Sequence, residues 1–163
     1  MDDALSTSLR LLLVVALVLL NGLFVAAEFS IVAVRRSRIQ TQAEEGRQLY
    51  KLALRAVDNL NNYLAATQLG ITIASIGLGF VGEPVLAEMM EPIFEDLFGE
   101  KFAGISSHAV AVPIAFAVIT ALHIGLGELA PKSLALFRAE RVVVATVPPV
   151  EVFRLVFWPA IWL

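Results

Sequence analysis

Three apolar stretches, each long enough to cross a lipid bilayer, constrain the fold of this chain more than any other feature. The first is almost wholly apolar from Leu11 to Ala27, and its helical pattern continues to Val34. A transmembrane helix needs about 20 mostly apolar residues. The chain has 163 residues, 58% hydrophobic and only 17% charged, which is too apolar for an ordinary soluble domain of this size. We therefore expect an all-α membrane protein with three transmembrane helices.

Charge placement predicts how these helices are oriented. Arg35, Arg36 and Arg38 follow the first span, and Lys132 and Arg138 mark the end of the third. Because Lys and Arg collect on the cytoplasmic side, this predicts an outer N-terminus and a cytoplasmic C-terminus in the inner (plasma) membrane. The N-terminus lacks the features of a cleaved signal, so we expect the first span to be retained. The predicted segments are a first span at about 8–34, a juxtamembrane helix at about 36–62, a second span at about 64–82, an outer acidic connection at 83–106, a third span at about 107–136 and an interfacial C-terminal belt at 142–163.

The connecting segments allow more than one interpretation. The juxtamembrane segment has basic residues at helical spacing beside leucines, which favours an amphipathic helix on the inner membrane surface, with a soluble connecting helix as the alternative. The acidic connection either gathers cations or is simply a solvated face. Pro148, Pro149 and Arg154 disfavour a fourth span, and the nearby aromatic residues suit the membrane interface. The sequence stops in an apolar segment, so we expect a cytoplasmic portion to follow.

The second span has two contrasting faces on a helical wheel. One face is small: Ala66, Gly70, Ala74 and Gly77. Small residues at this spacing allow close helix approach, which suits packing within the chain or a dimer contact. The opposite face is polar: Gln68, Thr72, Ser75 and Gly79. It either lines a polar pocket or holds hydroxyls that bond their own backbone.

The third span carries an ionisable residue, two glycines and a proline in an otherwise apolar setting. A carboxylate such as Glu128 is penalised at membrane depth by roughly 2.5 kcal/mol or more, so it normally faces a partner, a cavity or an ion. Pro131 has no N–H to offer the carbonyl of Gly127, four residues back. The carbonyl oxygen of Gly127 and the carboxylate of Glu128 could therefore be presented together, and hard cations such as Mg²⁺ or Ca²⁺ prefer oxygen ligands of both kinds. A proline kink with Glu128 bonded to a neighbouring helix is the alternative.

Depth brings the polar residues of the three spans together. At about 1.5 Å per helical residue, Glu28 lies roughly 10 Å from Arg35, Thr72 roughly 13 Å from Tyr63 and Glu128 roughly 15 Å from Arg138. All three come near the bilayer midplane, which is about 15 Å from either edge of the hydrocarbon core. The predicted metal site combines Glu28, Thr72, Ser75, the Gly127 carbonyl and Glu128, supported by Gln68 and Asn21.

The chemistry of this set restricts the ligand. Oxygen-only ligands and the absence of Cys favour Mg²⁺, Ca²⁺ or Na⁺ over soft metals, and two carboxylates suit a divalent ion best. His123 could suggest a transition metal but is expected to serve packing or hydrogen bonding. Lys132 marks the inner interface, with a salt bridge to Glu128 as its alternative role. Ser30 points nearly opposite to Glu28 and is left out. The net charge of -3 gives no reason to expect nucleic acid.

Four motifs resemble the membrane domain of the CorC/CNNM (cyclin M) magnesium transporters. They are Asn21-Gly22-Leu23-Phe24-Val25-Ala26-Ala27-Glu28-Phe29, Ala43-Glu44-Glu45-Gly46, Gln68-Leu69-Gly70-Ile71-Thr72 and Gly127-Glu128-Leu129-Ala130-Pro131-Lys132. The resemblance implies a homodimer of three-span protomers that exports Mg²⁺ in exchange for Na⁺, with a following cytoplasmic CBS-pair module that binds nucleotide. We expect the pocket between the three spans to bind dehydrated Mg²⁺. Many similar proteins carry Asn where Ile71 and Ser75 stand and Ser where Ala27 stands. Ile71 and Ala27 cannot supply such a side-chain oxygen.

Two other function classes compete with transport. A non-transporting domain could use the ion to sense Mg²⁺ or to anchor and dimerise the protein in the membrane. An intramembrane enzyme is not expected, because the sequence has neither a His-Glu-x-x-His signature nor a Gly-x-Ser-x-Gly turn, and the predicted spans contain no Asp.

Overall fold

The computed structural model describes residues 2–98 and 107–161, and these residues form helices joined by short turns. The elements are α1 (Asp2–Ala33), α2 (Arg36–Glu44), α3 (Gln48–Asp58), α4 (Leu60–Phe98), α5 (Ser107–Leu122), the π-helix η2 (His123–Leu129), α6 (Ala130–Phe137), α7 (Ala139–Val156) and α8 (Trp158–Ile161). No strand occurs within these ranges, so the all-α prediction is confirmed for them.

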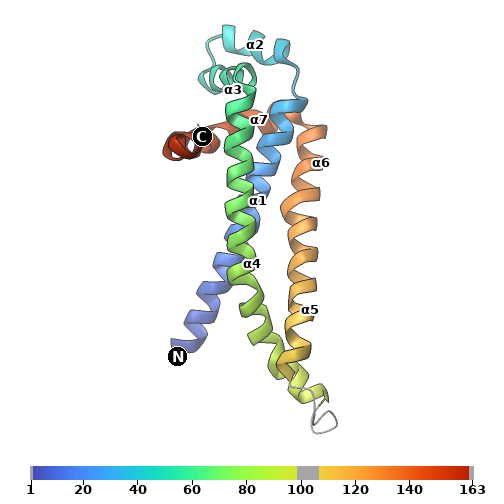
Figure 1. Ribbon diagram of the computed structural model, residues 1–163. Coiled ribbons are helices and arrows are strands. Elements are labelled where there is room, and N and C mark those ends of the chain that lie inside the picture. Colours follow the sequence, from blue (N-terminus) through green and yellow to red (C-terminus); the bar gives the residue numbers. More distant parts are fainter. Residues whose placement is uncertain (1, 99–106, 162–163) are drawn as a thin grey trace.

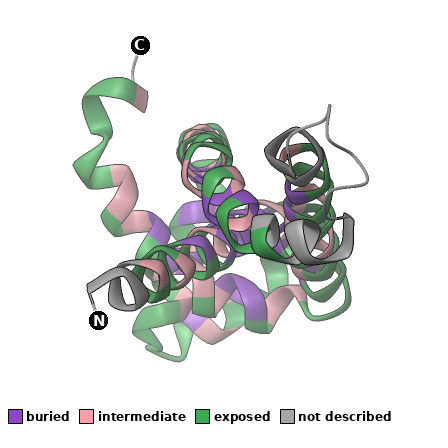
Figure 2. Cartoon of the chain, turned by 90° about the horizontal axis from the view of Figure 1, so that it is seen from below, coloured by how far each residue is buried: buried purple, intermediate pink, exposed green. Residues whose placement is uncertain are grey.

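Three helical segments run alongside one another and form the body of the molecule (Figure 1). Each contains a stretch long and apolar enough to cross a membrane: Thr7–Ala33, Leu60–Met89 and Val112–Phe137. Only 33%, 28% and 17% of their most apolar windows is buried within the molecule. Figure 2 shows the exposed residues on the outward sides of the helices. Such extensive exposed apolar surface is what a lipid-facing bundle requires.

The small face of α4 packs against α1 of the same chain. Ala66 and Ala74 are fully buried, and a Cβ added at Gly70 would lie 2.6 Å from the ring of Phe24. A Cβ at Gly77 would meet Leu17 at 3.4 Å. Of the two roles predicted for this face, the structure shows packing within the chain.

The predicted juxtamembrane segment at 36–62 is two helices, α2 and α3, at one end of the bundle (Figure 1). The chain reverses at Gly46, whose φ of +91° is readily adopted only by glycine. Arg36 closes this hairpin with an ion pair to Asp58 at 2.7 Å. Buried Ile39 of α2 and Ala53 of α3 belong to the same apolar core as α7. The hairpin therefore has a packed inner face.

The second span continues as helix well beyond its predicted end. Helix α4 runs to Phe98 with Pro84 and Pro92 inside it, where the sequence predicted a connection at 83–106. A proline inside a helix removes one backbone hydrogen bond and its ring crowds the carbonyl four residues back, and packing can offset this cost. The lack of a side chain at Gly82 allows such packing, because it lets Ile119 of α5 come so close that a Cβ on Gly82 would lie 2.4 Å from it. The remainder of the predicted connection, residues 99–106, lies outside the described residues.

Helix α7 crosses the ends of the three long segments at a steep angle, within the region predicted as an interfacial belt (Figure 1). Its buried face contains Val143, Val147 and Val150, although Pro148 and Pro149 lie within the helix. Phe153 meets Phe24 of α1 edge to face, with ring centroids 4.8 Å apart. The last two residues of the belt, 162 and 163, are outside the described part of the chain.

Candidate ion site between the three spans

A cavity of about 340 Å³ opens between α1, α4 and η2. Its walls combine carboxylates, amides and hydroxyls with a few apolar side chains. The residues that line this polar cavity are Asn21, Val25, Glu28, Phe29, Gln68, Ile71, Thr72, Ser75, His123 and Glu128. Oxygen-bearing residues from all three candidate spans therefore face one space.

Asn21 joins the three spans from a buried position. Its amide nitrogen donates to the carbonyl of Gly127 at 3.0 Å, and its amide oxygen accepts from the Ser75 hydroxyl at 3.3 Å. The side chain is 1% exposed, so both bonds lie away from solvent. A buried amide must satisfy its hydrogen-bonding groups, and these two contacts fix α1 against η2 and α4. Asn21 was expected only to support the site, and here it holds the cavity walls together.

The third span reaches the cavity through a π-helix rather than an α-helix. At its end, the N–H of Ala130 donates to the carbonyl of Gly125, five residues back. Pro131 follows at the start of α6 and has no N–H for the preceding turn. The sequence predicted that Pro131 would leave the Gly127 carbonyl available for an ion. In the structure that oxygen accepts a hydrogen bond from Asn21, and Gly127 is not among the lining residues.

The two carboxylates of the cavity are held loosely. Glu28 accepts a bond of 3.4 Å from the Gln68 amide, at the long end of the range for hydrogen bonds. Within residues 2–98 and 107–161, no hydrogen bond or ion pair engages the side chain of Glu128. Lys132 places its ammonium 4.5 Å from the centroid of the Phe29 ring. The lone pairs of both carboxylates remain largely available.

The hydroxyls of α4 differ from each other. Thr72 donates to the carbonyl of Gln68 at 2.8 Å, which is the local backbone bond considered as an alternative for this face. Ser75 instead reaches across the cavity to Asn21 and lies 3.4 Å from Nε2 of His123. Both hydroxyl oxygens can still accept a ligand, because a hydroxyl has two lone pairs.

Four of the five predicted ligands, Glu28, Thr72, Ser75 and Glu128, line the cavity together, and Gly127 does not. Ser30 is also absent from the lining and donates to the carbonyl of Ala27. His123 was set aside and yet lines the cavity. His123 precedes Glu128 by five residues. In an α-helix, with 3.6 residues per turn, two residues so spaced lie on different sides of the helix. In a π-helix, whose hydrogen bonds join residues five apart, they lie on the same side.

The donor set restricts how an ion could be held. Among the described residues, no group of three or more His, Cys, Asp or Glu side chains lies close enough to hold a metal ion. An ion in the polar cavity would therefore depend on Ser, Thr, Asn or Gln oxygens and on water, as well as on the two carboxylates. Mg²⁺ suits such a site, because it usually keeps several waters and binds one or two carboxylates.

Comparison with known proteins identifies the family. Residues 12–163 match the cyclin M transmembrane N-terminal domain. The chain belongs to the cyclin M family. This confirms the resemblance inferred from the four motifs, and it makes the chain a membrane protein of a transporter-type family.

Cyclin M family relatives occur in several bacteria. UPF0053 protein YhdT of Bacillus subtilis is 44% identical over 153 residues, which are 94% of this chain and 32% of the relative. UPF0053 protein YhdP of the same organism is 39% identical over 94% of this chain and 34% of its own length. The uncharacterized protein Rv1841c of Mycobacterium tuberculosis is 36% identical over 93% of this chain and 41% of its own length. The chain thus spans about a third to two fifths of the length of these curated relatives.

Proposed function

We propose that this chain is the membrane domain of a magnesium transporter that exports Mg²⁺ in exchange for Na⁺. The supporting observation is the polar cavity, where Glu28 of α1, Ser75 of α4 and Glu128 of η2 lie around one space. Membership of the cyclin M family, which is related to Mg²⁺ transport, supports the same assignment. The proposal includes the plasma membrane location, the outer N-terminus, a homodimer and a following cytoplasmic module that binds nucleotide.

The size of the cavity bears on how the ion travels. A volume of about 340 Å³ leaves room for water around a bound ion. We therefore propose that Mg²⁺ keeps part of its hydration shell, instead of binding fully dehydrated as the sequence suggested. Glu28 and Glu128 supply the negative charge, and Thr72 and Ser75 supply neutral oxygens.

Mg²⁺ flux into or out of liposomes containing the intact protein tests this function. Glu128→Gln removes one charge with little change of shape, and we expect flux to fall by at least about tenfold, because even the loss of an outer partner of a metal ligand costs about that much. Glu44→Gln, on the exposed surface of α2, is the control and keeps full flux. Unchanged flux in Glu128→Gln would remove the polar cavity from the mechanism. Flux that ignores the Na⁺ gradient would refute the coupling alone.

The same assay separates transport from sensing or anchoring. If the domain only senses Mg²⁺ or anchors the protein, the unsubstituted protein should show no Mg²⁺ flux under any gradient. This alternative also predicts that Glu128→Gln weakens Mg²⁺-dependent association of the protomers, which analytical ultracentrifugation in detergent measures. Flux from the unsubstituted protein excludes this alternative.

A further inference from the structure

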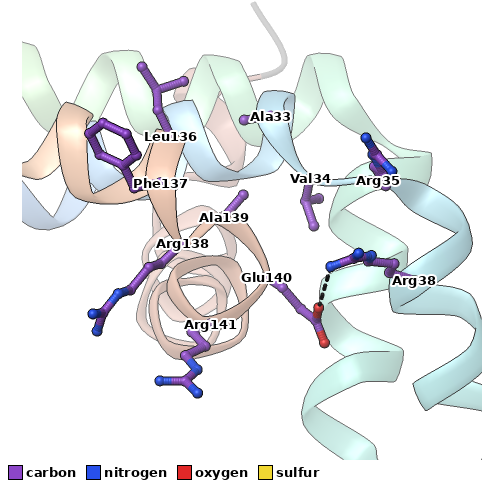
Figure 3. Close-up of a pocket in the computed structure, with 10 residues that line it drawn as sticks. All are labelled: Ala33, Val34, Arg35, Arg38, Leu136, Phe137, Arg138, Ala139, Glu140 and Arg141. Carbon is purple, nitrogen blue, oxygen red and sulfur yellow. Dashed lines mark ion pairs between the residues drawn. The ribbon is translucent and has the colours of Figure 1, made fainter.

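A second cavity, of about 580 Å³, lies at the end of the bundle that carries α2, α3 and α7 (Figure 3). It opens where α1 ends and where α6 turns into α7. The residues that line this basic cleft are Ala33, Val34, Arg35, Arg38, Leu136, Phe137, Arg138, Ala139, Glu140 and Arg141. The described lining thus includes four arginines and a single carboxylate. Arg138 and Arg141 extend to the same side of the cleft, and Arg35 extends away from them (Figure 3).

That carboxylate is already engaged. Glu140 pairs with Arg38 at 3.9 Å, as Figure 3 shows, and accepts a bond of 3.4 Å from the Tyr50 hydroxyl. In the part of the chain that the structure describes, no hydrogen bond or ion pair engages the side chains of Arg35, Arg138 or Arg141. The cleft therefore has an excess of positive charge that the chain itself does not neutralise.

The position of the basic cleft indicates the source of a neutralising anion. The first and third candidate spans end at Ala33 and Phe137, and both residues line the cleft. Leu136 and Phe137 are 55% and 88% exposed beside Arg138. An apolar surface that adjoins arginines at the end of a span matches a molecule with both a charged head and apolar chains. Basic pockets between transmembrane helices bind anionic lipid headgroups in this way.

We propose that the basic cleft binds the phosphate headgroup of an anionic phospholipid. The guanidinium groups of Arg138 and Arg141, which extend to the same side in Figure 3, contact the phosphodiester oxygens, because planar guanidinium forks match phosphate geometry. The acyl chains lie against Leu136 and Phe137. The site is separate from the polar cavity, with which it shares no described lining residue.

Native mass spectrometry of the full chain in detergent tests the proposal by counting bound lipids. Phosphatidylglycerol is the anionic probe and phosphatidylcholine is its zwitterionic counterpart. We expect selective retention of phosphatidylglycerol, and we expect Arg138→Gln/Arg141→Gln to weaken that binding by roughly 25-fold, at about fivefold per arginine. The matched control Lys51→Gln/Arg55→Gln removes two exposed charges from α3 and keeps the binding.

Three results would overturn the proposal. One is equal loss in the control, which indicates diffuse attraction to basic charge. Another is full retention in Arg138→Gln/Arg141→Gln. The third is displacement of the lipid by inorganic phosphate at similar concentration, which indicates a soluble anion. Arg138→Lys/Arg141→Lys keeps the charge but loses the planar forks, so its binding should lie between those of the unsubstituted protein and the double Gln variant. If the double Gln variant does not fold, Arg141→Gln alone should show about a fivefold loss.

Discussion

Two carboxylate sites in this molecule are built in opposite ways. The Glu151 clamp consists of Glu151, Arg154 and Tyr63: the carboxylate accepts from the Tyr63 hydroxyl at 2.7 Å and from Arg154 at 2.7 and 2.9 Å. In the polar cavity, the bonds of Glu28 and Ser75 are 3.3 to 3.4 Å long. Neither Lys nor Arg is among its described lining residues. The clamp is complete without a ligand, whereas the cavity leaves negative charge for one.

The clamp has the electrostatic properties of a structural pair. The hydrogen bond from Arg154 lowers the pKa of Glu151, and burial only partly opposes this effect. The hydrogen bond to Glu151 in turn raises the pKa of Arg154. Arg154 also lies over the Trp158 ring, 5.8 Å from its centroid. A carboxylate that is already paired with a cation has few lone pairs left for another ion.

The sharpest test of this contrast is the effect of Mg²⁺ on stability. At a hundredfold excess over its dissociation constant, a bound ion stabilises a folded protein by about 2.7 kcal/mol. We expect Glu28→Gln/Glu128→Gln to lose this Mg²⁺-dependent increase in thermal unfolding experiments and to remain folded without Mg²⁺. An increase that survives in the double variant would place the ion elsewhere.

The clamp should show the reverse behaviour. Glu151→Ala leaves the Tyr63 hydroxyl and a largely buried Arg154 without their partner, so we expect a loss of about 2 kcal/mol with the Mg²⁺ response intact. Glu140→Ala on the same helix is the control, since its more exposed pair with Arg38 is worth less than about 1 kcal/mol. Urea or thermal unfolding measures both. Equal losses would mean that the clamp has no special structural role.

Two glycines of η2 test how tightly the cavity wall is packed. In Gly127→Ala the new Cβ would lie 2.8 Å from Cδ2 of His123 and 3.1 Å from Nδ2 of Asn21. We expect a loss of about 1 to 2 kcal/mol from this overpacking, together with weaker Mg²⁺ binding. At Gly125 a Cβ would meet nothing within 4 Å, so Gly125→Ala should change little. Isothermal titration and thermal unfolding compare the two variants.

The smallest effect is a pH dependence of stability from Glu151. Its pKa lies below the ordinary value of 4.5 in the folded chain. The contribution is therefore fully present above about pH 4.5 and fades as the pH falls through the lowered pKa. Unfolding experiments from pH 6 downward should show this loss in the unsubstituted protein and a weaker one in Glu151→Gln. Identical pH profiles would contradict the assignment.

Much of this arrangement could be predicted from side-chain periodicity and depth. The faces of α4 and the common level of Glu28, Thr72 and Glu128 follow from 3.6-residue geometry, which holds wherever a helix is regular. His123 was missed as a lining residue because η2 has a wider turn, and its position depends on how Asn21 and Pro131 meet the third span. The course of α4 past Pro84 likewise depends on packing that local propensity does not contain.

The crosswise course of α7 has a mechanical consequence. Phe153 holds this helix to Phe24 of α1, and Glu151, two residues earlier, holds it to Tyr63 of α4. One helix is thus fastened to two of the three walls of the polar cavity. If α1 and α4 spread or tilt at this end, α7 has to roll or slide with them, so the angle of α7 reports the separation of those two helices.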